Sequence, residues 1–466
     1  TMKKFTTRQW IKFSLATLLY IPFCIWIQNL WLLLGIALIA EIYLFKFIPW
    51  GFWKKSKNPL FRMVMEWVDA IVFALIAVSI IFTFFFQNYQ IPSSSLEKTL
   101  LVGDFLMVSK LNYGPRIPNT PIAFPLAQHT MPVLNTKSYL DWPNWPYKRL
   151  KGLGSVKRND IVVFNFPAGD TVALQVTNPD YYTLCYLYGR DQVVGNKEVY
   201  GDIIYRPVDR RENYVKRCVA LPGDMLEVRN NDVYINGDRQ TPPKKMQLNY
   251  FVQTNGQQLN EEHFRHMEVS VEDRVLLSNH QNFSAWALHM GFEPNADGTY
   301  PPLYHFPLTQ EAVEWLNNSG LARKIIVEPD PNSDTIYPLG YYKKWTRDNY
   351  GPVWIPKKGM SIELTPESYP IYERCIVNYE GNKAEERDGK YFINGKEAST
   401  YTFQMDYYFM MGDNRHNSAD SRMWGFVPED HIVGEPVVVW LSLDKDRSLF
   451  DGKIRFNRLF NWVIQN

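Results

Sequence analysis

The amino-acid sequence predicts a membrane-anchored, mainly β protein, and three observations support this fold class. The first 86 residues contain apolar runs long enough to cross a bilayer, which needs roughly 20 apolar residues per helix. The chain after them contains short segments in which apolar and polar residues alternate, as they do in half-buried strands. Residues 240–385 interrupt this pattern and include a helical segment, so we expect a large inserted second domain there.

Length and composition narrow the class further. The 466 residues suffice for an anchor and a sizeable soluble region. The formal net charge of +2 gives no reason to expect a polyanionic partner, so we expect no nucleic acid. None of the four cysteines forms a C-x-x-C pair, so we expect no metal site. Whether two of Cys185, Cys218 and Cys375 form a disulfide stays open at this point.

Three apolar runs, at residues 10–27, 30–48 and 67–86, predict three transmembrane helices. Only Gln28 and Asn29 separate the first two runs, which therefore read as a tight hairpin. A cleaved signal peptide is the alternative, but no A-x-A-like cleavage site with a polar mature sequence follows.

The basic residues predict the orientation of this anchor. One group precedes or opens the first run and the other lies between the end of the second run and the third, whereas the tip of the hairpin carries no charge. The positive-inside rule places both groups in the cytoplasm, so everything after residue 86 is expected outside it. The basic residues are Lys3, Lys4, Arg8, Lys12, Lys46, Lys54, Lys55, Lys57 and Arg62.

The soluble region reads as β-rich. Strands are predicted at residues 160–167, 232–237, 390–395 and 432–440. Within the expected insert, Thr309 predicts the cap of a helix over residues 309–316. The aromatic, Pro-rich residues 115–150 read as an ordered loop. The predicted units are a hairpin with its basic loop (1–66), a third membrane helix (67–86), a β domain (87–239 and 386–466) and the insert (240–385).

Four segments are candidates for carrying chemistry. They are IPSSSLEKTLLVGD directly after the anchor, then KRNDIVVFNFP, YVKRCVALPGD and GDNRHNSADSRMWGFVP. Each one alone is explained as a turn, a strand or a solvated basic pair. Their joint occurrence in this order is more specific than any single segment.

Together these segments resemble the bacterial type I signal peptidases, or leader peptidases, which are membrane-anchored Ser/Lys endopeptidases. The first segment is similar to the family's Ser-x-Ser-Met-x-Pro-Thr-Leu box with its following Gly-Asp, and the last is close to the family's final box. Two positions depart from the pattern, because Leu96 replaces the usual Met and Lys98 replaces the usual Pro. The resemblance implies a signal-peptidase-like catalytic domain after the anchor.

The resemblance also implies the roles of individual residues. Ser95 takes the place of the nucleophile, and Lys216 that of the general base. The Ser93 hydroxyl and the Ser95 backbone N–H are expected to form the oxyanion hole, and Ser418 to orient the lysine. Asp420 and Arg422 match a supporting ion pair, and the residues that resemble the apolar lining of the substrate pockets are Ile91, Leu96, Leu100 and Val215.

Elementary chemistry agrees with this assignment. A serine hydroxyl needs a base to take its proton, and a lysine can serve only when it is neutral. Apolar surroundings lower the pKa of a lysine, and Lys216 lies beside Val215 and a Cys-Val-Ala-Leu run on a predicted buried strand. His416, with Asp413 or Asp420 as its partner, is the rival base.

The expected function is removal of signal peptides from exported preproteins at the outer face of the bacterial inner membrane, by cleavage after small residues. Signal peptides and membrane lipid are the expected partners, with the translocation machinery as a further candidate, and no cofactor is implied because Ser and Lys suffice. The expected localisation is multi-pass, with a cytoplasmic N-terminus and a periplasmic catalytic domain. The alternatives are an inactive relative that acts as a binding module in export or envelope assembly, and a peptidase dedicated to one substrate.

Overall fold

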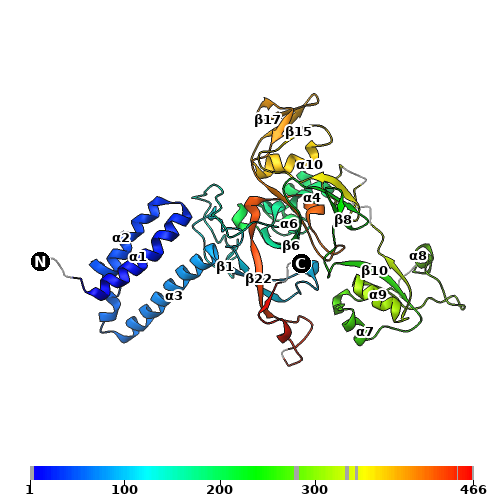
Figure 1. Ribbon diagram of the computed structural model, residues 1–466, viewed down its shortest axis with the longest axis horizontal. Coiled ribbons are helices and arrows are strands. Elements are labelled where there is room, and N and C mark those ends of the chain that lie inside the picture. The colour runs from blue at the N-terminus through cyan, green and yellow to red at the C-terminus, as the bar shows by residue number, and fades with distance from the viewer. Residues whose placement is uncertain (1–4, 278–282, 331–334, 342–344, 449, 464–466) are drawn as a thin grey trace.

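A computed structural model describes residues 5–277, 283–330, 335–341, 345–448 and 450–463. Figure 1 shows a helical N-terminal part beside a β-rich part in which two lobes flank a central sheet. Of the basic residues used above to orient the anchor, Lys3 and Lys4 lie outside the described residues.

The helical part consists of two long helices and a shorter helical stretch between them. The long helices are α1 (Thr7–Ile27) and α3 (Pro59–Phe84). The stretch between them combines η1 (Leu30–Leu34), α2 (Gly35–Ala40) and η2 (Glu41–Phe45). Among the described residues, α1 and α3 are the two helices that are long and apolar enough to cross a membrane, whereas the stretch Leu30–Phe45 is shorter.

The third apolar run differs from its predicted bounds of 67–86. The helix α3 begins earlier, because the Asn58 side chain caps its first N–H groups and Pro59 suits the first helical position. It also ends earlier, at Phe84, because Phe86 already pairs with Ser109 in a β ladder. The polar cap residue decides the start of this helix, and hydropathy alone does not reveal it.

Contacts between aromatic rings show which ends of the helical stretches lie together, and so in which direction each stretch runs. At one end, Trp26 of α1 lies 6.3 Å from Phe84 of α3, so the C-terminal ends of both helices lie together. At the other end, the ring of Phe45 lies 5.8 Å from that of Phe5, just before α1. The stretch Leu30–Phe45 therefore runs back along the whole length of α1 (Figure 1).

The central sheet joins strands from distant parts of the chain in the order β1-β2-β22-β3-β6-β20-β21, with β23 paired to β22. All of these pairs are antiparallel. The strands predicted at 160–167 and 432–440 are confirmed as β3 and β22. The bounds are β1 Phe86–Gln90, β2 Asp104–Ser109, β3 Ile161–Asn165, β6 Asn213–Ala220, β20 Tyr407–Met411, β21 Val427–Pro428, β22 Ile432–Ser442 and β23 Asn461–Trp462.

Among the edges of this sheet that carry no neighbouring strand in the part of the chain that the structure describes are those of β1 and of part of β6. The strand β1 pairs only with β2. On the side away from β3, β6 pairs with β20 only over Arg217–Ala220, so its residues 213–216 present a free edge. Free N–H and C=O groups on such edges accept another extended chain.

Smaller elements surround the central sheet. The predicted strands at 232–237 and 390–395 are confirmed as β8 and β17. The helices are α4 Tyr181–Tyr188, α5 Arg190–Gly195, α6 Lys197–Tyr200, α10 Tyr369–Arg374 and α11 Ser421–Trp424. The strands are β4 Thr171–Ala173, β5 Ile203–Tyr205, β7 Met225–Arg229, β8 Asp232–Ile235, β9 Asp238–Arg239, β14 Tyr350–Trp354, β15 Ser361–Glu363, β16 Ala384–Arg387, β17 Lys390–Ile393, β18 Lys396–Glu397 and β19 Thr400–Thr402.

A separate four-stranded sheet lies in the region of the expected insert, in the order β11-β12-β10-β13. Its apolar core contains Tyr250, Phe264, Phe306 and Leu316 and is distinct from that of the central sheet. Thr309 caps α9 as predicted. The elements are β10 Gln247–Thr254, β11 Val275–Leu276, β12 Leu303–Thr309, β13 Ala322–Val327, α7 Glu261–His266, α8 Phe283–His289 and α9 Gln310–Asn318.

The second half of the expected insert packs differently. Ile336, Tyr350 and Cys375 share one core with Leu226 and Phe409, which lie on either side of the insert in the sequence. The strand β14 also pairs with β7. Residues on both sides of residue 385 therefore belong to the same apolar core. An inserted second domain over residues 240–385 stays a prediction. All four cysteines are free thiols, which answers the disulfide question that the sequence left open.

Candidate active site

Ser95 and Lys216 meet in a buried position beside the free edges of β1 and β6. Ser95 lies in a short turn, η4 (Ser94–Leu96), between β1 and β2, and Lys216 lies on β6. The Lys216 Nζ donates to the Ser95 Oγ at 2.7 Å and to the Val215 carbonyl oxygen at 3.2 Å. The two side chains belong to residues that are only 6% and 4% exposed. A hydroxyl and an amine at this distance have the geometry of a nucleophile and its base.

The surroundings of Lys216 favour its neutral form. Burial lowers the pKa of Lys216 to about 8, and the carboxylates of Asp420 and Asp413 oppose this change without cancelling it. Removing an ammonium from water disfavours the charged state, which is the reason for this direction. A substantial fraction of Lys216 is therefore deprotonated in mildly alkaline solution.

The segment after β20 holds the serine turn in place. The Asn414 backbone N–H donates to the Ser95 carbonyl oxygen at 3.1 Å, and its side-chain amide donates to the Ser94 carbonyl oxygen at 3.2 Å. Gly412 lies so close that a Cβ there would come within 2.6 Å of the Ser95 carbonyl oxygen. Only glycine fits at this point. In the sequence this Gly-Asp-Asn segment reads only as a turn, and its local pattern gives no sign of the contact with Ser95.

Asp413 ties the lysine strand to the serine segment. Its carboxylate accepts two hydrogen bonds from Arg217, at 2.8 and 2.7 Å, and one from the Thr99 hydroxyl at 2.8 Å. Arg217 follows Lys216 on β6, and Thr99 follows the serine turn. This buried, bidentate pair therefore fixes both sides of the contact between Ser95 and Lys216.

His416 contacts residues other than the carboxylates that the sequence suggested as its partners. Its Nε2 lies 3.2 Å from the Asp348 carboxylate, and its Nδ1 accepts from the Asn249 backbone N–H at 3.3 Å. Neither Asp413 nor Asp420, the carboxylates considered as its partners, forms an ion pair with it in the part of the chain that the structure describes. The geometry therefore favours lysine over histidine as the base.

The ion pair expected between Asp420 and Arg422 is present and fully buried. Arg422 donates to the two carboxylate oxygens of Asp420 at 2.9 and 2.8 Å, and the Gly412 backbone N–H donates to the same carboxylate at 3.1 Å. Burial raises the pKa of Asp420, but the Arg422 charge and these hydrogen bonds outweigh it and hold the pKa below its ordinary value. The pair thus supports the backbone next to Asn414.

The two remaining predicted hydroxyls make fewer contacts. Ser418 is buried, and its Oγ has no hydrogen-bond partner among the described residues. It still belongs to the site, because the point where a Gly412 Cβ would lie is 2.3 Å from this Oγ and 2.6 Å from the Ser95 carbonyl oxygen. Ser93 is exposed just before the serine turn and makes no capping hydrogen bond.

The predicted pocket residues form one apolar cluster next to the serine turn. Ile91, Leu96 and Leu100 are buried together with residues of β2, β3 and β22, and Val215 packs against them from β6. Each flanks Ser95 or Lys216 closely in the sequence. The structure thus brings all four residues together in one cluster next to the turn that contains Ser95.

Lys98, at the position that departs from the family pattern, links the serine segment to the second sheet. Its backbone has a φ of 70°, and its Nζ donates to the Met267 carbonyl oxygen at 3.0 Å. Burial lowers the pKa of Lys98 to about 8. Met267 lies in the core of the second sheet, so Lys98 couples the two units.

Comparisons with known proteins agree with these motifs. Residues 64–294 and 360–441, more than half of the chain, match the family model described as signal peptidase, peptidase S26. Signal peptidase I of Buchnera aphidicola subsp. Acyrthosiphon pisum is 25% identical over 411 residues, covering 87% of this chain and 83% of the relative. Signal peptidase I of Haemophilus influenzae is 22% identical over 414 residues, covering 88% and 79%. That of Pseudomonas aeruginosa is 25% identical over 400 residues, covering 84% and 75%.

Proposed function

Because the chain belongs to the signal peptidase family, peptidase S26, we propose that it removes signal peptides from exported preproteins, with Ser95 as nucleophile and neutral Lys216 as general base. The observation that carries the proposal is the 2.7 Å contact between Lys216 Nζ and Ser95 Oγ in a buried site. A binding module without catalytic activity does not require a buried lysine next to Ser95 with its pKa lowered to about 8, so this feature favours a peptidase.

In the proposed reaction, the Ser95 Oγ attacks the carbonyl carbon of the scissile bond while its proton moves to Lys216 Nζ. The Ser95 N–H lies in the first turn of η4, where N–H groups have no partner within the turn, and with the Ser93 hydroxyl it stabilises the oxyanion. Such a donor lowers the activation barrier by about 3 to 4 kcal/mol.

The tetrahedral intermediate then breaks down as the bond to the leaving amine is cleaved. Lys216 returns the proton to the leaving amine, which leaves an acyl group on Ser95. A water molecule then attacks this ester while Lys216 takes its proton; the bond between the acyl carbon and Ser95 Oγ breaks, and Lys216 returns the proton to Oγ. We assign Ser418 to orienting the lysine amine during these transfers, because its buried hydroxyl has no other hydrogen-bond partner among the described residues.

The substrate is proposed to bind as an extended chain. The free edges of β1 and of residues 213–216 on β6 offer backbone partners for such a segment. The apolar cluster with Leu96, Leu100 and Val215 lies beside the nucleophile and accepts small side chains one and three positions before the bond. This preference rests on the family resemblance together with the placement of the cluster.

The anchor is proposed to cross the inner membrane three times, with the catalytic unit on the outer face. Since α1 and α3 run in the same direction, the chain must return between them, and the stretch Leu30–Phe45 does so along the full length of α1. Such a stretch of 16 residues rises about 24 Å as an α-helix, close to a hydrocarbon core of about 30 Å. The basic residues then face the cytoplasm.

We propose signal peptides, membrane lipid and the translocation machinery as partners, and no nucleic acid.

Cleavage of a preprotein by the full chain in detergent, followed over pH, tests this function. Only deprotonated Lys216 can accept the serine proton, so the rate is expected to rise with pH and to reach half of its plateau near pH 8. The cut is expected after a small residue, and a preprotein with bulky side chains at the two pocket positions serves as the control. A rate that does not change between about pH 6 and 9 contradicts lysine as the base. Cleavage of only one member of a preprotein panel would favour the dedicated peptidase.

A further inference from the structure

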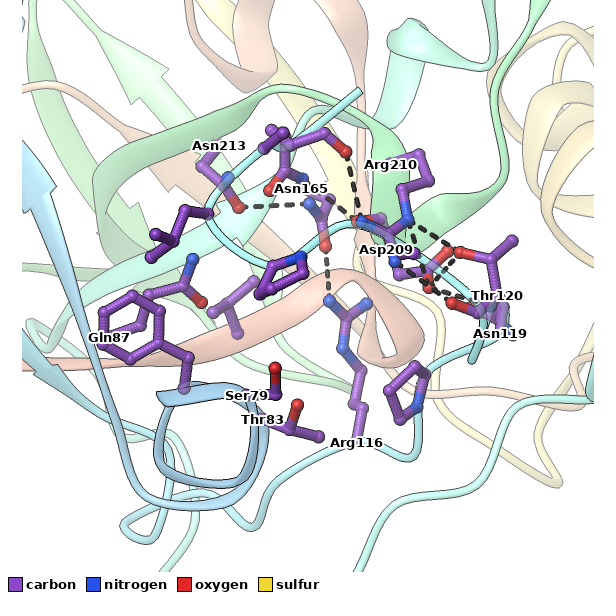
Figure 2. Close-up of a pocket in the computed structure, with 18 of the residues that line it drawn as sticks. Ser79, Thr83, Gln87, Arg116, Asn119, Thr120, Asn165, Asp209, Arg210 and Asn213 are labelled. Atoms are coloured by element: carbon purple, nitrogen blue, oxygen red, sulfur yellow. Dashed lines mark hydrogen bonds and ion pairs between the residues drawn. The ribbon is translucent and has the colours of Figure 1, made fainter. Parts of the chain in front are cut away.

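A cavity of about 600 Å³ lies between the end of α3 and the β-rich part, outside the contact between Ser95 and Lys216. Figure 2 shows Ser79 and Thr83 of α3 at the bottom with Arg116 beside them, Gln87 of β1 at the left, and Asp209 and Arg210 at the upper right. The loop that follows Arg116 forms a further wall. The cavity therefore sits where the apolar helix meets the soluble region.

Positive charge dominates the cavity. Its lining contains three basic side chains, those of Lys110, Arg116 and Arg210, and one carboxylate, that of Asp209. Asp209 is already bound, because it accepts hydrogen bonds from the backbone N–H and the hydroxyl of Thr120, at 3.0 and 2.9 Å. The cavity thus has an excess of positive charge, as a site for an anion does.

The two arginines are held in place by the protein. Arg210 donates to the Thr120 hydroxyl at 2.7 Å and to the Thr120 carbonyl oxygen at 3.1 Å. Arg116 donates to the side-chain oxygen of Asn165 (Figure 2). It also donates to the backbone carbonyl oxygen of Asp430. The oxygens in these hydrogen bonds are uncharged, so they hold the guanidinium groups in position and leave their charge in place. The Asp209 carboxylate lies 3.8 Å from Arg210.

Lys110 differs from the arginines. Its backbone N–H donates to the Phe85 carbonyl oxygen at 2.8 Å, directly after α3, and its side chain forms no ion pair with any residue that the structure describes. Burial, together with the charges of Arg116 and Arg210, lowers the pKa of Lys110 to about 7. An anion bound between these groups would relieve their repulsion.

The remaining walls are apolar. Phe82 of α3 lines the cavity, and Phe124 and Leu126 of the loop line it while being 43% and 69% exposed. An inorganic anion gains nothing from contact with apolar side chains, whereas an acyl chain packs against them favourably. The same loop region is tied to the end of α1, because Lys148 Nζ donates to the Ile27 carbonyl oxygen at 3.0 Å and the Trp26 indole donates to the Lys151 carbonyl oxygen at 3.0 Å.

We propose that this cavity binds one phospholipid from the leaflet at the C-terminal end of α3, with its phosphodiester between Lys110, Arg116 and Arg210 and the start of its acyl chains along Phe82, Phe124 and Leu126. The bound lipid fixes the catalytic part at a set height above the membrane. This site goes beyond the proposed peptidase function, and its test needs no cleavage.

The test is a titration of the delipidated full chain in detergent with dihexanoyl phosphatidylglycerol, read as one-to-one adducts by native mass spectrometry. Lys110→Gln is expected to weaken binding about tenfold, the scale of one charge-assisted hydrogen bond to phosphate. Lys110→Arg keeps the charge and is expected to retain most of the affinity. Lys151→Gln is the matched control, because Lys151 is exposed near the same end of α1 but does not line the cavity. It is expected to bind like the unmodified chain.

Four results overturn the proposal. Equal weakening by Lys110→Gln and Lys151→Gln indicates surface charge alone, and equal binding of dihexanoylglycerol shows that the phosphate is not recognised. Displacement by inorganic phosphate at the same concentration as the lipid identifies a free-phosphate site. Displacement by a signal peptide, with lipid affinity insensitive to Lys110, identifies the cavity as an extension of the peptide site. Unchanged melting temperatures of the variants separate each of these results from a failure to fold.

Discussion

Replacement of Lys216 by methionine is expected to lower the rate of preprotein cleavage by roughly 10³-fold or more, since a positioned general base contributes up to about 10⁴-fold. Methionine resembles lysine in length and adds no charge to a buried site, so the loss of the amine at 2.7 Å from Ser95 Oγ is the main change. Initial rates of the full chain in detergent, measured near pH 9 where Lys216 is largely neutral, give the ratio.

Lys98→Met is the matched control for this variant. Lys98 is also buried, lies three residues after Ser95 and has its pKa lowered to about 8, but its amine is bound to the Met267 carbonyl oxygen. Its removal is expected to leave the rate within about tenfold of the unmodified chain, because no catalytic proton passes through it. Loss of activity in both variants, or in Lys98→Met alone, contradicts the assignment of Lys216 as the base.

Replacement of Arg422 by methionine is expected to destabilise the fold by about 3 to 5 kcal/mol, because it leaves the buried carboxylate of Asp420 without its partner. Only two backbone N–H groups, those of Gly412 and of residue 422, then hold this carboxylate among the described residues, so the backbone beside Ser95 loosens as well. Denaturation of the full chain in detergent, followed by tryptophan fluorescence, measures the shift of the midpoint.

Two further variants separate charge from packing at this pair. The double variant Asp420→Asn with Arg422→Met removes the unpaired charge and is expected to recover part of the lost stability. Arg229→Met breaks an ion pair with Glu227 on the surface and is expected to leave the midpoint unchanged. A midpoint of Arg422→Met equal to that of the unmodified chain contradicts a structural role for the buried pair.

The sequence predicted which side chains meet at the site better than it predicted the contacts that hold them there. Ser95, Lys216, Asp420 and Arg422 were identified because their motifs carry uncommon residue types at fixed spacing. The link from Asp413 to Arg217 was missed, since its two residues lie far apart in the sequence and each reads locally as part of a turn or a basic pair. Only the pairing of β6 with β20 brings them together.

Tertiary contacts also decided what local patterns left open. The sequence offers His416 as a rival base, whereas in the structure its Nε2 lies 3.2 Å from Asp348, in the region expected as an insert. The start of α3 at Pro59 depends on a cap that hydropathy does not register. The role of Ser418 in orienting the lysine and the domain bounds at residues 240 and 385 stay predictions.

The most direct test of the account compares Ser95→Ala with Ser94→Ala in the cleavage of one preprotein, with the products identified by mass. The two serines are neighbours in the same turn, but only the Ser95 hydroxyl receives a hydrogen bond from Lys216. The account predicts that Ser95→Ala abolishes the mature product while Ser94→Ala still releases it after a small residue. Retained cleavage by Ser95→Ala would contradict the Ser/Lys mechanism, and the binding-module alternative would apply if the unmodified chain also left every preprotein intact.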